Sequence, residues 1–130
     1  MRDIAARLIA CETSANPSSE TTHPAATCVL EKLQPQLATM MGKAGFRAVL
    51  SRSLALATAK DHSLAALDLK ADGSLEGWER LEGQEGAEKV IESSVLLVTQ
   101  LLGLLVAFIG DNLTLRLVRN VWPKLALEDL

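Results

Sequence analysis

The sequence predicts an all-α protein: a compact bundle of about five helices around a central apolar helix at about residues 90–109. Leucine occurs 24 times and alanine 18 times among 130 residues, whereas tyrosine is absent and Phe and Trp occur twice each. A β-sandwich or barrel would contain more β-branched and aromatic residues. Hydrophobic residues make up 48% of the chain, which excludes disorder over most of its length. A chain of this size can bury a core as a single domain, 1–130.

The first helix is predicted over residues 2–12. Its apolar side chains recur at helical spacing and share one face, at Ile4, Ala5, Leu8 and Ile9. Residues 13–23 are polar and contain Pro17, which favours a flexible linker. A linker of this length would let the first helix dock on another subunit.

Two helices are expected between residues 24 and 60. The first carries an apolar stripe up to Met41, and Pro35 within it either kinks the helix or begins a new one. Gly42 and Gly45 mark its end. The second runs from Phe46 to about Lys60. It has two apolar sides and is therefore expected to have neighbours on both.

Residues 61–86 are less regular, with four glycines, and predict an irregular segment or a short hairpin. Asp72-Gly73 is a turn signal that could close a hairpin between residues 67–69 and 74–75.

The segment 95–109 is the most apolar in the chain, with only Thr99 and Gln100 clearly polar. It is shorter than the roughly 20 residues of a membrane-spanning helix, which favours a buried core helix. The alternative is a membrane-inserted hairpin over 95–122. Gly103 and Ala107 stand four residues apart, a spacing that lets another helix approach closely, in a soluble core or at a membrane dimer face.

The last helix is expected to be capped by Asp111 or Asn112 and to stop at Pro123. It carries a polar stripe that includes two arginines. The candidate interface residues are Arg116 and Arg119, flanked by Leu115 and Trp122. Arginine and tryptophan are enriched among energetic anchors of interfaces. The alternative is a solvated face whose arginines pair with the acidic run at 76–88.

One motif has the spacing of a metal loop. Asp68, Asp72, Glu76 and Glu79 fall within twelve residues, with Gly73 at the sixth position and Leu75 at the eighth. The segment resembles the calcium-binding loop of EF-hand proteins, in which oxygen ligands alternate around a glycine bend and a glutamate closes the loop. Lys70 departs from that pattern, because it places an ammonium where a ligand should be. We therefore predict no metal site, with these four carboxylates as weak calcium candidates.

Other chemistry finds no support in the sequence. It contains no nucleophile elbow, no phosphate-binding loop and no Cys/His cluster at metal spacing, so we predict no catalytic residue and no cofactor. The net charge of −3 argues against nucleic-acid binding. Cys11 and Cys28 are expected to be reduced thiols. Residues 8–11 look like a lipoprotein cleavage box, but the preceding apolar run is too short, so we expect an unmodified Cys11 and a cytoplasmic protein.

These observations predict a non-enzymatic helical protein–protein interaction or adaptor module that binds a protein partner or itself, most simply as a homodimer. Two alternatives stay open. One is a membrane-acting protein that inserts the 95–122 hairpin. The other is a helical pocket for an apolar small molecule, lined by Met40, Met41, Phe46 and Phe108.

Overall fold

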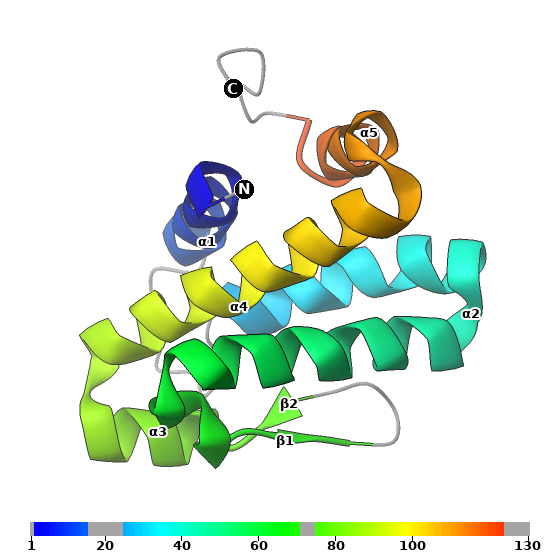
Figure 1. Cartoon of the computed structure of the whole chain (residues 1–130). Helices are drawn as coiled ribbons and strands as arrows, with labels where there is room; N and C mark the ends of the chain where they lie inside the picture. Colours follow the sequence, from blue (N-terminus) through cyan, green and yellow to red (C-terminus); the bar gives the residue numbers. More distant parts are fainter. Residues whose placement is uncertain (1, 16–24, 71–74, 124–130) are drawn as a thin grey trace.

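The computed structural model describes residues 2–15, 25–70 and 75–123 (Figure 1). Its elements, in chain order, are α1 (Arg2–Ala15), α2 (Ala25–Lys60), the 3₁₀ helix η1 (His62–Ala66), β1 (Asp68–Leu69), β2 (Leu75–Glu76), α3 (Trp78–Glu85), α4 (Ala87–Ile109) and α5 (Asp111–Val121). The helices pack against one another and the two strands form one small hairpin. The predicted all-α bundle is confirmed.

Helix α4 occupies the centre of the bundle, as predicted. It contacts α1, α2, α3 and α5, and Leu97, Val98, Leu101, Leu102 and Leu105 are all fully buried. Burial of one such side chain contributes roughly 1.5–3 kcal/mol. The apolar face predicted for the first helix is also correct, because Ile4, Ala5, Leu8 and Ile9 are all buried. This face packs on α2 and α4 of the same chain. Helix α1 continues to Ala15, so residues 13–15 are helical rather than part of a linker, and residues 16–23 lie outside the described chain.

Helix α2 is a helical hairpin rather than one straight rod. Its only residue with non-helical backbone angles is Gly42, at φ 79° and ψ 164°, and the chain reverses there (Figure 1). Glycine is favoured at a position with positive φ because glycine lacks a Cβ atom. The helix continues through the exposed Pro35 with helical backbone angles, so no new helix begins at that proline. The second arm starts directly after Gly42 and not at Phe46.

The segment 61–86 contains the expected hairpin. Strands β1 and β2 are antiparallel, with Asp68 opposite Glu76 and Leu69 opposite Leu75. The segment also contains helix α3, which was not predicted. Trp78 and Leu81 are its buried side chains, and they lie three residues apart on its inner face.

The cap predicted for the last helix is wrong. Its N-cap is Gly110, at φ 87°, and Asp111 is already the first helical residue. No side chain caps this helix. The hydroxyl of Thr114 instead donates to the carbonyl oxygen of Gly110 at 2.8 Å. Gly110 therefore ends α4 and begins α5 with no loop between them.

Candidate functional site

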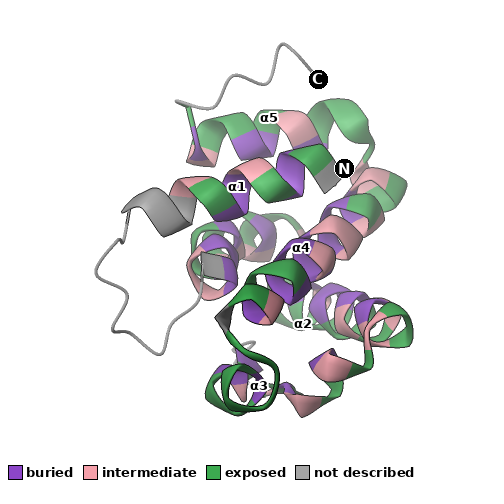
Figure 2. Cartoon of the chain, turned by 90° about the vertical axis from the view of Figure 1, so that its left-hand side faces the viewer, coloured by how far each residue is buried: buried purple, intermediate pink, exposed green. Residues whose placement is uncertain are grey.

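One side of α4 is exposed to solvent, although the whole helix was expected to be buried. No charged residue occurs from Ser93 to Gly110. A helix that is apolar all round was expected to have neighbours all round. In the structure, Gly103, Ala107 and Phe108 are exposed and Leu104 is half-buried. Phe108 exposes 61% of its surface, the most of any large hydrophobic side chain among the described residues. Figure 2 shows exposed positions on the end of α4 next to α5.

For a soluble protein, the small residues of α4 predicted a close helix crossing inside the monomer. The structure has no such crossing at Gly103 and Ala107. A Cβ atom added at Gly103 would meet nothing within 4 Å. Ala107, one turn further along, is exposed as well. Gly103 and Ala107 therefore form a shallow, uncovered strip, with the larger side chains of Leu104 and Phe108 beside it. We call these four residues the α4 face.

The predicted α5 interface is only partly at the surface. Arg116 and Arg119 are exposed, Leu115 is half-buried, and Trp122 is only 4% exposed and packs in the core. Trp122 is thus a core residue, and any docking stripe on α5 must be carried by the arginines. The alternative pairing with residues 76–88 is not formed within the described chain. The ion pair of this run joins Glu76 to Lys70, and none of the described ion pairs includes an arginine of α5.

The calcium candidates are spread over the hairpin and the start of α3. Asp68 and Glu76 are exposed on opposite strands, and Lys70 Nζ lies 3.7 Å from a Glu76 carboxylate oxygen. Glu79 is in the first turn of α3, and Asp72 lies outside the described residues. Over the described ranges, no three His, Cys, Asp or Glu side chains gather closely enough to hold a metal ion. Among the described candidates, Asp68, Glu76 and Glu79 are therefore not gathered around one point, and the candidate Asp72 lies outside the described residues.

Side chains expected to line an apolar pocket are dispersed. Phe46 is 1% exposed in the core, whereas Met40 is 43% exposed and Phe108 is on the α4 face. Met41 is half-buried against the core. These four residues do not enclose a common cavity.

One polar junction had no signal in the sequence. Asp61 caps η1 by accepting from the Ser63 N–H at 3.0 Å. Its other carboxylate oxygen accepts from the Ser93 hydroxyl at 3.2 Å and pairs with Lys89 Nζ at 3.1 Å. The junction ties η1, at the end of α2, to the first half of α4.

The charges of this junction stabilise each other. Burial raises the pKa of the Asp61 carboxyl, but the hydrogen bonds from Ser63 and Lys89 outweigh it and hold that pKa below its ordinary value. The hydrogen bond to Asp61 raises the pKa of Lys89. Stability from Asp61 is therefore present above the ordinary carboxyl pKa and is lost as the pH falls through its lowered value. Stability from Lys89 is present below its ordinary pKa and is lost as the pH rises through its raised value.

We expect Asp61→Asn to lower the free energy of unfolding by about 1–2 kcal/mol at pH 7, since it removes a charge that accepts three hydrogen bonds. The difference from the wild type should begin to shrink below about pH 4, where the carboxyl of the unfolded chain becomes protonated, and should disappear below the lowered pKa of Asp61 in the folded protein. Urea denaturation at a series of pH values measures both effects. Glu31→Gln, at an exposed position of α2, is the matched control and should change little. A difference that is constant down to pH 3 would contradict the assignment.

Helix α4 also has the length and composition of a membrane span. From Glu88 to Ile109 it is the one helix in the described part of the chain that could cross a bilayer by these criteria. Half of the most apolar part of this helix is buried inside the structure. The core helix of a soluble protein can have the same length and composition.

Comparisons of the chain with protein-family models, with curated proteins and with solved structures found no match.

Proposed function

We propose that the protein is a non-enzymatic helical interaction module that forms a homodimer through the α4 face. The observation that carries this proposal is an uncharged surface on the central helix, in which Gly103 and Ala107 leave room and Phe108 is 61% exposed. Exposed apolar side chains that gather beside small residues are typical of interaction sites rather than of inert surface.

A second copy of the chain fits this face better than an unrelated partner. We infer that the strip of Gly103 and Ala107, where side chains are small or absent, serves as a groove, and that Leu104 and Phe108 form a ridge beside it on the same helix. In a two-fold dimer each surface patch meets its own copy, so the ridge of one chain can fill the groove of the other. No charge on this face opposes that contact.

The setting that we propose is the cytoplasm. Cys11 and Cys28 are both half-buried thiols in helices, which agrees with a reducing compartment. Arg116 and Arg119 on α5 are a second exposed surface that a protein partner could use.

The dimer proposal predicts that Gly103→Leu separates association from stability. Helix propensity favours leucine over glycine, and a Cβ atom at this position meets nothing, so the monomer should be at least as stable as the wild type. The added side chain fills the groove and should weaken dimerisation about tenfold or more. Sedimentation equilibrium without detergent measures association, and thermal melting measures stability.

Control variants locate the interface. Ile91→Glu changes an apolar side chain that is 48% exposed at the other end of α4, and it should leave association intact. Arg119→Glu tests α5. If Arg119→Glu abolishes association while Gly103→Leu does not, the interface is on α5 and the α4 face is the wrong surface.

A membrane-acting hairpin over 95–122 is the second candidate, favoured by the length and apolar composition of α4. It requires α5 to enter the bilayer with its exposed polar stripe, which includes Arg116 and Arg119. Placing each arginine at the centre of a bilayer costs roughly 2.5–3.5 kcal/mol or more. Monodisperse protein in detergent-free buffer that does not float with lipid vesicles would exclude this candidate.

A further inference from the structure

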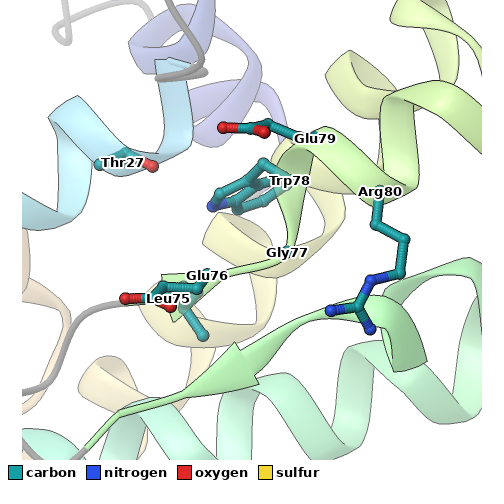
Figure 3. Close-up of a pocket in the computed structure, with 7 residues that line it drawn as sticks. All are labelled: Thr27, Leu75, Glu76, Gly77, Trp78, Glu79 and Arg80. Carbon is teal, nitrogen blue, oxygen red and sulfur yellow. The ribbon is translucent and has the colours of Figure 1, made fainter.

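A cavity of about 380 Å³ lies where β2 runs into α3, beside the start of α2 (Figure 3). It is lined by Thr27, Leu75, Glu76, Gly77, Trp78, Glu79 and Arg80. This volume lies within the range of small-ligand sites. The cavity is at the α3 end of the bundle, whereas the α4 face is near α5 (Figure 1). It is therefore independent of the proposed dimer.

The indole of Trp78 has an unsatisfied hydrogen-bond donor at this cavity. Trp78 is 5% exposed, and its Nε1–H is the one buried side-chain polar group without a partner in the described chain. In Figure 3 the nitrogen-bearing edge of the ring points into the space between Thr27 and the Leu75–Glu76 strand. A buried donor without an acceptor costs about 1–3 kcal/mol, so a ligand that supplies an acceptor gains from this position.

The fold holds this donor in place. Gly77, immediately before Trp78, has φ +105° and lies against the backbone of Ala66 and Leu67. The main chain therefore enters α3 in a fixed direction. Trp78 cannot turn its donor toward water without leaving the core that it packs in.

The charged groups around the donor define what the cavity accepts. The carboxylates of Glu76 and Glu79 extend toward the Thr27 side of the cavity, on either side of the Trp78 ring (Figure 3). Arg80 extends away from the ring, on the other side of Gly77. The Glu76 carboxylate also lies 3.7 Å from Lys70 Nζ, so a ligand ammonium would compete with that exposed ion pair. Together the two carboxylates still repel an anion and attract a cation. The ligand must accept a hydrogen bond from Trp78 through a neutral atom and carry positive charge for the glutamates.

We propose that this cavity binds a small organic amine whose ammonium group lies between Glu76 and Glu79 and whose neutral carbonyl or hydroxyl oxygen accepts from Trp78 Nε1–H. The Thr27 hydroxyl provides a further hydrogen bond to the ligand. Leu75 contacts its carbon chain. This assignment uses the indole donor, which nothing else in the described chain satisfies.

The test uses lysinamide, which carries ammonium groups and a neutral carboxamide. The indole N–H signal of Trp78 is followed in two-dimensional ¹H–¹⁵N NMR spectra of the full chain. The protein has two tryptophans, so two indole N–H signals are expected. The Trp78 signal is the one that disappears in Trp78→Phe and remains in Trp122→Phe. Lysinamide is expected to shift this signal downfield in a saturable way at millimolar concentration. Hexanamide, which lacks the ammonium groups, and 1,5-diaminopentane, which lacks the acceptor, should each bind at least about fivefold more weakly.

Variants separate the pocket from non-specific attraction. Glu76→Gln combined with Glu79→Gln should weaken lysinamide binding about tenfold or more. Glu82→Gln, an exposed carboxylate elsewhere on α3, should leave it unchanged. The proposal is overturned if the Trp78 signal does not move, if the double variant binds as well as the wild type, or if inorganic phosphate or Ca²⁺ shifts the signal and lysinamide does not. Each of these outcomes is independent of whether Gly103→Leu changes the oligomeric state.

Discussion

Leu101→Asp is expected to leave the chain largely unfolded. Leu101 is fully buried on the central helix, which contacts α1, α2, α3 and α5. Loss of a core leucine costs roughly 2–5 kcal/mol. An unpaired carboxylate at the same position adds several kcal/mol more. Domains of this size are stable by only about 5–15 kcal/mol, so the sum is comparable to the whole stability. Leu105→Asp should behave in the same way.

Phe108→Asp is the matched control because it places the same carboxylate on the same helix, at a side chain that is 61% exposed. This variant should keep its helical circular dichroism and a cooperative thermal transition. The Leu101 variant should show neither. A Leu101→Asp protein that melts within a few degrees of the wild type would show that α4 is not the centre of the core.

Periodicity was sufficient to predict most helices of this fold. Ile4, Ala5, Leu8 and Ile9 recur at helical spacing, and all four are buried. Ser93 to Gly110 lacks charge, which predicted the central helix. The same lack of charged residues left undetermined which side of α4 is buried. Between Ser93 and Gly110 no charged residue marks a solvent side, so the sequence does not separate the buried side of Leu101 and Leu105 from the exposed side of Gly103 and Phe108.

Local sequence patterns gave wrong or missing predictions at positions where contacts between distant segments determine the structure. Pro35 is tolerated within α2, and the chain reverses at Gly42 instead, where positive φ is required. Helix α3 has only Trp78 and Leu81 as buried positions, too few for a periodic pattern. Trp122 follows an amphipathic helix and looks like an interface anchor in the sequence, but its position in the core depends on how α5 packs.

The two polar features of the structure bring together residues that are distant in the sequence. Asp61 meets Ser93 and Lys89, about 30 positions away, and no spacing rule connects them. The cavity at Trp78 includes Thr27 from the start of α2. Glu76 and Glu79 are calcium candidates by their spacing in the sequence, and in the structure they line the same cavity as the Trp78 indole. Only the folded chain shows that donor to be unsatisfied.

Gly77→Ala is expected to destabilise the protein by about 2–5 kcal/mol, which combines two separate costs. The residue has φ +105°, where an L-residue with a side chain is strained. The added Cβ atom would overlap the Ala66 carbonyl oxygen and lie 3.2 Å from Leu67 Cα, and both are backbone atoms that cannot rotate away. Urea denaturation should therefore show a much lower midpoint.

Gly83→Ala is the control for this prediction because it makes the same change inside α3, the helix that Gly77 precedes. Gly83 lies in α3 without positive φ, and a Cβ atom there would meet nothing within 4 Å. Alanine should stabilise that variant by roughly 0.5–1 kcal/mol through helix propensity. Opposite signs for the two glycines would establish that the close approach of Gly77 to the backbone of Ala66 and Leu67, and not the helical content of α3, fixes the entry to this helix. Equal effects would mean that the close approach at Gly77 is absent in solution. The Trp78 indole signal should also move in Gly77→Ala and stay unchanged in Gly83→Ala, because only Gly77 sets the direction in which the indole donor points.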